Sequence, residues 1–254
     1  MTQMRLDRAA PVALGVVVLA AWQGLVWAFQ VPDYLLPGPV AILGAFFAAP
    51  RLLLGSLVST LAVTFAALLA AALLGVAMAL LMALSRIARA AIQPWAVVLQ
   101  VTPIVAIAPL IIVLVGNPFI SLVVCATIVA FFPVFANTVT GLEAVPPELL
   151  DLFRLHGAGR GRTLLLLRIP AAVPYFLSGL RISGGLALVG AVVAEFVAGS
   201  GGFASGLAYR ILEAGYRLEI PRMFAALVLL AVAGIGINMG LGAFAGFALR
   251  RRGE

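Results

Sequence analysis

Long apolar runs separated by short polar stretches dominate the chain, and they predict a bundle of membrane-spanning helices. A helix needs about 20 mostly apolar residues to cross the hydrocarbon core of a bilayer, and a membrane β-barrel would show short alternating segments instead. The predicted spans cover residues 11–29, 55–83, 92–115, 119–140, 172–198 and 223–249. We therefore expect an all-α integral membrane protein with six transmembrane helices, forming a single domain over residues 1–254.

Prolines interrupt this pattern at two places. The stretch VPDYLLPGP after the first run cannot stay helical, so residues 30–40 are expected to form a loop, followed by a short interfacial helix at 41–53. The third run contains Thr102 and Pro103 near its middle. A broken helix at membrane depth is tolerated where it lines a cavity, so both residues are candidates for a substrate pathway. The alternative is a helix kink that packing absorbs.

One long polar segment, residues 143–170, separates the fourth and fifth runs. Pro147 suits the start of a helix, and Glu148 and Asp151 follow in its first turns, where carboxylates match the positive end of the helix dipole. Arg154 lies toward the other end, and Gly157 is suited to ending the helix. The segment predicts a helix at about 147–156, a sharp turn over 157–161, and a second helical run, TLLLLRIP, that leads into the fifth span.

Composition strengthens the membrane interpretation, and charge predicts the orientation. The chain is 64% hydrophobic and 10% charged, whereas soluble domains carry roughly 25% charged residues. All 16 basic residues are arginine, and they cluster at the ends of the apolar runs, which fits topology better than nucleic-acid binding. Six spans place eleven arginines on the side of both termini (Arg5, Arg8, Arg86, Arg89, Arg154, Arg160, Arg162, Arg168, Arg250, Arg251, Arg252) and four on the other (Arg51, Arg210, Arg217, Arg222). The arginine-rich side, with segment 143–170 and both termini, is predicted to be cytoplasmic, and segment 200–222 to be outside.

The polar segment resembles the coupling loop of membrane subunits of binding-protein-dependent ABC importers. That family carries E-A-A, three residues, G, nine residues and I-x-L-P. Here Asp151, Leu152 and Phe153 stand at E-A-A, Gly157 stands at the glycine, and residues 167–170, which end in Ile169 and Pro170, stand at I-x-L-P. Leu152 and Phe153 are bulkier than the two alanines, so the docking surface differs in shape. LLPGP, MALSRIARAAIQPW, FFPVFANTVTGL and PAAVPYFLSGLRI resemble the nitrate, sulfonate, taurine and thiamine-pyrimidine branch, and the resemblance covers nearly the whole chain.

The resemblance implies a permease subunit of a type I ABC importer in the bacterial inner membrane. The short helix would fit a cleft on a cytoplasmic ATPase, with Leu152 and Phe153 as apolar contacts, and with Glu148, Asp151 and Arg154 as polar ones. Gly157 would set the angle at which the chain leaves the helix, and Ile169 and Pro170 would join the loop to the fifth span. The implied partners are two ATPases, a second copy of the chain as a homodimer, and an external substrate-binding protein. The cargo would be a small polar solute, with a slight preference for a pyrimidine.

Two charged residues fall inside the fifth span. An ionisable residue in a membrane segment is a functional candidate by default, so Glu195 is a candidate for the pathway. The alternative is a carboxylate at the outer headgroup level, held by water or by the nearby loop. Arg181 lies two to three turns into the span, and its side chain is expected to reach back to the cytoplasmic interface.

No chemistry is expected within the chain itself. A Walker A phosphate-binding loop needs a lysine, and the sequence has none, so ATP must be bound by a separate subunit and no cofactor or metal is expected. An intramembrane serine hydrolase would need a nucleophile beside a base. Ser200 and Ser205 are predicted outside, whereas the sole histidine, His156, is predicted in the cytoplasm. A secondary transporter or channel that uses Glu195 remains the alternative function.

Overall fold

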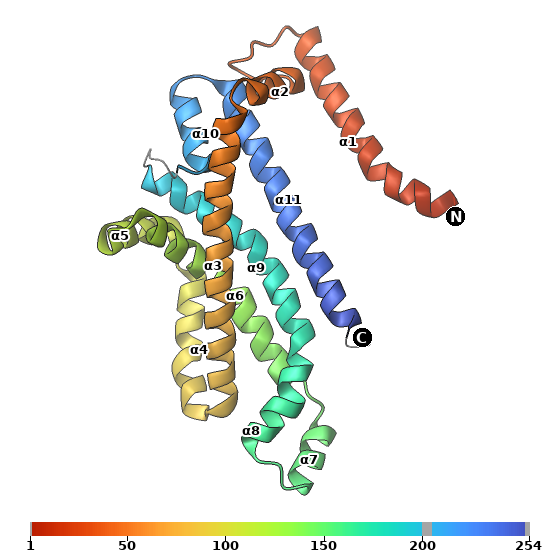
Figure 1. The fold of residues 1–254 in the computed structure, drawn as a ribbon, viewed down its shortest axis with the longest axis vertical. Coiled ribbons are helices and arrows are strands. Elements are labelled where there is room, and N and C mark those ends of the chain that lie inside the picture. The colour runs from red at the N-terminus through yellow and green to blue at the C-terminus, as the bar shows by residue number, and fades with distance from the viewer. Residues whose placement is uncertain (1, 200–204, 252–254) are drawn as a thin grey trace.

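The computed structural model describes residues 2–199 and 205–251, without the side chains of residues 2–9, 11 and 12 (Figure 1). Every regular element in these ranges is helical. The helices are α1 (Thr2–Ala28), α2 (Pro39–Ala48), α3 (Pro50–Leu84), α4 (Arg86–Val101), α5 (Ile104–Val115), α6 (Pro118–Glu143), α7 (Pro147–Leu155), α8 (Arg160–Thr163), a π-helical turn η1 (Leu164–Arg168), α9 (Ile169–Ala198), α10 (Leu207–Tyr216) and α11 (Ile220–Arg250). The all-α expectation is therefore confirmed for the part of the chain that the structure describes.

Four helical stretches are long and apolar enough to cross a membrane: α3, α6, the continuous stretch Arg160–Ala198 that ends in α9, and α11. The pair α4 and α5 makes a fifth if a broken span is counted. The apolar part of α1, Ala13–Ala28, is a shorter helix. The predicted spans at 55–83, 119–140, 172–198 and 223–249 thus correspond to observed long helices, whereas the count of six stays a prediction.

The predicted interruption of the third span, 92–115, is observed as a sharp break between two helices rather than as a kink. α4 and α5 meet at an angle of 104°, with the break at Thr102 and Pro103. Proline disfavours helical geometry in the residue before it, and Thr102 accordingly has extended dihedral angles, φ −73° and ψ 121°. The same rule corrects the predicted interfacial helix at 41–53, because Ala49, which precedes Pro50, separates α2 from α3.

The core of the bundle is the close pair α6 and α9, with α3 packed against both. Glycines on α9 allow this approach. A methyl group on Gly179 would lie 2.6 Å from the Pro133 carbonyl oxygen of α6, and one on Gly190 would lie 2.9 Å from the Ala126 Cα atom. Small residues at helix contacts let backbones come close in membrane proteins, where packing rather than hydrophobic exclusion holds the helices together.

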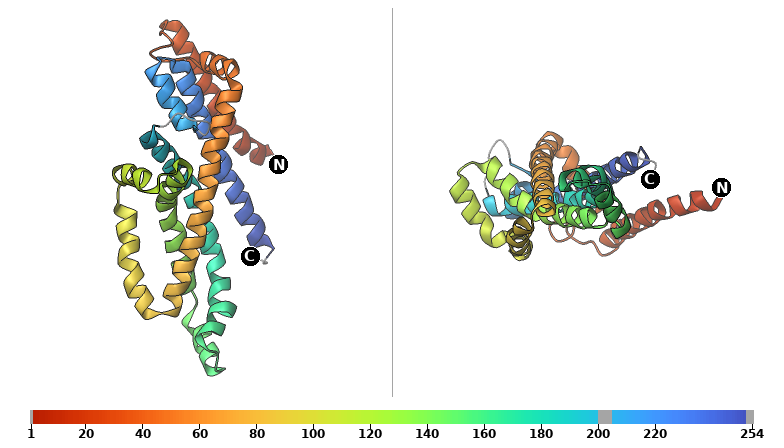
Figure 2. Two further views of the ribbon diagram at one scale, coloured as in Figure 1. Left: turned by 60° about the vertical axis from the view of Figure 1, so that its left-hand side comes forward. Right: turned by 90° about the horizontal axis from the view of Figure 1, so that it is seen from below.

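The molecule is elongated, and its two ends differ (Figures 1 and 2). α2 and α10 lie at one end, called here the α10 end, and α7 and α8 lie at the other, called the α7 end. α1 leans away from the bundle and is tied to it near its Ala28 end, where Gln23 Oε1 accepts a 3.0 Å hydrogen bond from the Val40 amide. The ring of Trp22 lies 6.3 Å from that of Phe224 on α11.

Candidate functional site: the α7 loop and the polar groups of the spans

The α7 loop, residues 143–170, projects from the α7 end of the bundle (Figure 1). The predicted helix at 147–156 is observed as α7, with Pro147 in its first turn, Glu148 exposed at the positive end of its dipole and Arg154 in its last turn. Arg154 Nη1 donates a 2.8 Å hydrogen bond to Asp151 Oδ1 one turn earlier. This pair is exposed, so it contributes little to stability and stays available to a partner.

Gly157 ends α7 in the manner expected from the sequence. Its φ is +68°, a left-handed conformation that only glycine adopts without strain. Its amide donates to the Arg154 carbonyl, and the Ala158 amide donates to the Phe153 carbonyl, both at 2.9 Å. These two bonds form a Schellman motif, which satisfies the last carbonyls of the helix and reverses the chain direction. The turn sends the chain back toward the bundle as α8.

An exposed apolar edge runs along α7. Leu149, Leu152 and Leu155 follow one another every three residues, and their exposed fractions are 42%, 47% and 85%. No residue of α7 is fully buried, but Leu150 and Phe153 are half-buried. Leu152 was predicted from the sequence as an apolar contact, whereas Leu149 and Leu155 were not, although their three-residue spacing is visible in the sequence.

The α7 loop is joined to the core through the start of α9. The second helical run predicted at TLLLLRIP is observed as α8, η1 and the first turn of α9. Leu164 is buried, and Ile169 packs against the same cluster of core residues, which includes Phe135 and Leu142 of α6. η1 and the first turn of α9 are therefore held to α6 by packed side chains, and α7 is joined to them through the turn at Gly157 and α8.

A cleft of about 730 Å³ separates α7 and α8 from the turn between α3 and α4. Five arginines line it together with apolar residues: Arg86, Arg89, Arg154, Arg160 and Arg168. Arg89 Nη1 pairs with Glu143 Oε1 at 2.5 Å and ties α4 to the end of α6. Because Arg89 and Arg154 pair with carboxylates, the positive charge of the cleft comes mainly from Arg86, Arg160 and Arg168.

Glu195 is held by its own chain. Its side chain is buried, with 4% exposure, and it accepts hydrogen bonds from the Thr60 hydroxyl at 2.8 Å and from the Ala208 amide at 3.0 Å. Thr60 Oγ1 in turn accepts a 2.9 Å bond from the Leu207 amide. Leu207 and Ala208 begin α10, and their amides would otherwise be unsatisfied. Glu195 and Thr60 thus cap α10 from two other helices, as in the alternative in which a nearby loop holds the carboxylate.

Thr102 and Pro103 lie at the break between α4 and α5, where the sequence placed them. Thr102 is half-buried and Pro103 is exposed. The Thr102 hydroxyl donates a 2.6 Å hydrogen bond to the Val98 carbonyl on its own helix. Glu195 bonds to α3 and α10 rather than to this break, so the three pathway candidates do not form one cluster, and their role stays a prediction.

Arg181 is bound to α11, a contact that the sequence did not predict. Its Nε and Nη2 atoms donate hydrogen bonds of 3.2 and 2.9 Å to Asn238 Oδ1 on α11. The side chain therefore crosses the α9–α11 contact, where its guanidinium group also lies beside Gly242. A partner 57 positions away gives no local signal in the sequence, which is why this pairing was missed.

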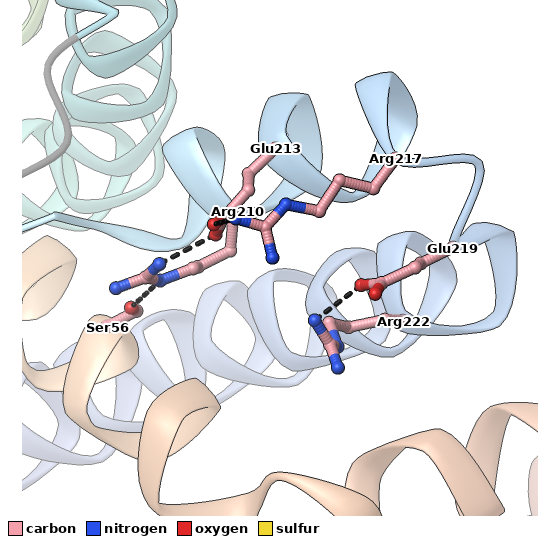
Figure 3. Close-up of polar contacts among 6 residues, drawn as sticks. All are labelled: Ser56, Arg210, Glu213, Arg217, Glu219 and Arg222. Carbon is pink, nitrogen blue, oxygen red and sulfur yellow. Dashed lines mark hydrogen bonds and ion pairs between the residues drawn. The ribbon is translucent and has the colours of Figure 1, made fainter.

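The α10 end carries a network of ion pairs over α10 and α11 (Figure 3). Arg210 bonds to Ser56 of α3 at 3.0 Å and to Glu213 at 2.7 Å, and Glu213 also pairs with Arg217 at 3.0 Å. Arg222 pairs with Glu219. α10 buries Leu207, Ala208, Ile211 and Ala214 on one face.

The structure also bears on the serine hydrolase alternative. His156 lies at the α7 end, where its Nδ1 atom is 2.8 Å from the Leu152 carbonyl oxygen, whereas Ser205 lies at the opposite end, two residues before the start of α10. These two residues cannot form a nucleophile and base pair, and Ser200 lies outside the described residues.

Comparisons with known proteins agree with the helical architecture. Residues 71–252 match the family of binding-protein-dependent transport system inner membrane components. A probable ABC transporter permease protein of Haemophilus influenzae is 36% identical over 89% of this chain and 91% of its own length. The riboflavin transport system permease protein RibX of Chloroflexus aurantiacus is 37% identical over 87% of this chain and 82% of its own. A putative aliphatic sulfonates transport permease protein of Bacillus subtilis is 32% identical over 87% and 79%.

A solved structure shares the fold. The crystal structure of an amino acid ABC transporter with histidines superposes with a TM-score of 0.64 at 20% identity, over 81% of this chain and 96% of that one. Three observations support the same family assignment. The chain has several apolar helices of spanning length, the family match covers most of its residues, and its relatives have similar lengths. The chain is a multi-pass inner-membrane protein that belongs to the binding-protein-dependent transport system inner membrane components, the permeases of ABC transporters.

Proposed function

We propose that the chain is the pore-forming subunit of an ATP-driven importer of a small polar solute, and that α7 is its coupling helix. The observation that carries the proposal is the placement of α7. This amphipathic helix projects from one end of the bundle, presents Leu149, Leu152 and Leu155 to solvent, and is joined to α9 by a packed turn. A monomer gains nothing from exposed leucines on a projecting helix, so a partner is expected to cover them.

The partner proposed for α7 is a cytoplasmic ATPase. The arginines of the α3–α4 turn, the α7 loop and the end of α11 gather on the α7 side of the chain, which the positive-inside rule places in the cytoplasm. Both chain termini would face the same side, with α1 and the broken pair α4–α5 completing six spans. Closure of two ATPases on ATP would then displace α7 and, through Leu164 and Ile169, the pair α6 and α9.

The complete transporter is proposed to contain two copies of this chain, two ATPases and an external binding protein. A symmetric pair forms a path at its two-fold axis, and the apolar α1, which leans away from its own bundle, leaves room for a second copy. The α10 end, with its charged network over α10 and α11, would receive the binding protein. The curated relatives carry different names for their cargo, riboflavin in one and aliphatic sulfonates in another, and these names support a small organic or ionic solute.

Co-purification of an ATPase tests the proposal. The affinity-tagged chain is expressed in its own cells, extracted in mild detergent and assayed for vanadate-sensitive ATP hydrolysis in the eluate. We expect Leu152→Asp and Leu155→Asp to lower the co-eluting activity at least tenfold, because a charge replaces the apolar contact of α7. Leu218→Asp is the matched control, since Leu218 is 75% exposed at the α10 end, and it should retain the activity. Equal retention in all three variants would refute α7 as the docking element.

A further inference from the structure

An arginine lies well inside α9, which belongs to one of the helical stretches long enough to cross a membrane. Arg181 is the thirteenth of the 30 residues of α9, Ile169–Ala198. At 1.5 Å per residue it stands about 18 Å from the α7 end of the helix and about 26 Å from the other end. Its partner Asn238 is the nineteenth of the 31 residues of α11, also well inside the helix. The hydrocarbon core is about 30 Å thick, so both side chains belong to it.

The guanidinium group of Arg181 is fixed in position but is not neutralised. Asn238 Oδ1 accepts from both Nε and Nη2, which orients the planar group, and a neutral amide leaves the full positive charge in place. Among the residues that the structure describes, no carboxylate forms an ion pair with Arg181. Glu195, the carboxylate on the same helix, lies about 21 Å further along it and is bound to Thr60 and Ala208.

Arg181 borders a face of α9 that no described helix covers. Phe176 and Leu180 look toward α3, with which they line a common apolar groove. Ser178, Ile182 and Val189 are exposed on another side, and a methyl group on Gly185 would meet nothing within 4 Å. Arg181 is itself exposed beside this strip. A bare cation is costly against lipid chains, so this face is expected to meet water in a cavity or path.

We propose that Arg181, oriented by Asn238, is an anion-binding station on the translocation path, and that the solute carried past it is a small oxyanion such as a carboxylate, sulfonate or phosphate. A guanidinium group presents paired N–H donors that match two oxygens of such an anion. In a symmetric pair of chains, a second Arg181 on the shared path would double the positive charge there. This inference rests on the proposed function, because it assigns the solute class of that path.

Charge-selective labelling tests the proposal. Cysteine is placed one turn to either side of Arg181, as Ser178→Cys and, in a second variant, Gly185→Cys. The complex with its ATPase, in nanodiscs, is treated with a negatively charged sulfonatoethyl and a positively charged trimethylammonium methanethiosulfonate. Cys125 is fully buried, and the parent protein measures its background. Each reporter is combined with Arg181→Gln, Arg181→Lys or, as a matched arginine at the α10 end, Arg51→Gln.

We expect both reporters to react, and the negative reagent to react faster. The ratio of the two rates should fall at least about fivefold in Arg181→Gln, because the field of a unit charge one helical turn away acts oppositely on the two reagents. Arg181→Lys and Arg51→Gln should keep the ratio. No labelling at either position, or a ratio that Arg181→Gln leaves unchanged, would overturn the proposal. ATPase activity of the same complexes is measured alongside, so a bound ATPase with no anion preference refutes this inference and leaves the proposed function standing.

Discussion

The hydrogen bonds that hold α10 to the bundle allow a quantitative prediction about Glu195. In Glu195→Ala, the Thr60 hydroxyl and the Ala208 amide both lose their acceptor in a buried site. A buried donor without a partner costs about 1–3 kcal/mol, so the pair is expected to cost about 3 kcal/mol after partial rearrangement. Because 1.4 kcal/mol is a factor of ten in an equilibrium constant, detachment of α10 should become roughly 100-fold more frequent. Glu195→Gln keeps one carbonyl oxygen as an acceptor and should cost about half as much.

Hydrogen–deuterium exchange of the α10 amides measures this effect in nanodiscs, since local opening controls exchange of protected amides. The peptide that contains Leu207 and Ala208 should exchange roughly 100-fold faster in Glu195→Ala and about tenfold faster in Glu195→Gln. Glu219→Gln is the control, because the Glu219–Arg222 pair is partly exposed and is worth at most about 1 kcal/mol. Unchanged exchange of the α10 peptide in Glu195→Ala would refute the capping role and restore Glu195 as a free carboxylate.

Two glycine substitutions test the turn after α7 and the core of the bundle. Gly157→Ala should destabilise the end of α7 by about 1 kcal/mol, because a φ of +68° strains any residue with a Cβ atom. Gly159→Ala is the control, because Gly159 has an ordinary φ of −67°. Exchange of the α7 amides distinguishes the two variants, and equal exchange would contradict the strain argument. Gly179→Ala should lower the thermal unfolding midpoint in detergent, because the new methyl group would lie 2.6 Å from the Pro133 carbonyl oxygen. Gly185→Ala is the control, because a methyl group there meets nothing within 4 Å. Equal midpoints would show that α6 and α9 do not pack as closely as described.

Local signals in the sequence were sufficient for the long helices and for α7. Proline at a helix start, carboxylates in the first turn and glycine at the end act within a few residues, so α7 and the left-handed Gly157 were predictable. Pro103 indicated in the sequence that the third span is interrupted, but not whether the interruption is a kink or a sharp break. A proline inside an apolar run permits both a mild kink and a sharp turn, and the packing of α5 on α6 and α9 decides between them.

Pairings between distant residues could not be predicted in this way. Thr60 and Glu195 are 135 positions apart, and Arg181 and Asn238 are 57 apart. Helix periodicity predicts which face of a helix is apolar, but not which neighbouring helix that face contacts or at which position along the helix the contact lies. Glu195 therefore became a pathway candidate because it is charged, although its contacts cap α10. Arg181 was expected to extend toward the interface, whereas its hydrogen-bond partner is Asn238 of α11.

Site-specific photo-crosslinking in native membranes tests the coupling role of α7 most directly. A photoreactive amino acid is placed at Leu155, the most exposed residue of the α7 edge, or at Leu218 at the α10 end. The account predicts a crosslink from position 155 to a nucleotide-binding ATPase, with a yield that changes on addition of ATP and vanadate. It predicts no crosslink from position 218 to that ATPase. A crosslink from position 155 to a protein outside the cell, or only to its own bundle, would contradict it.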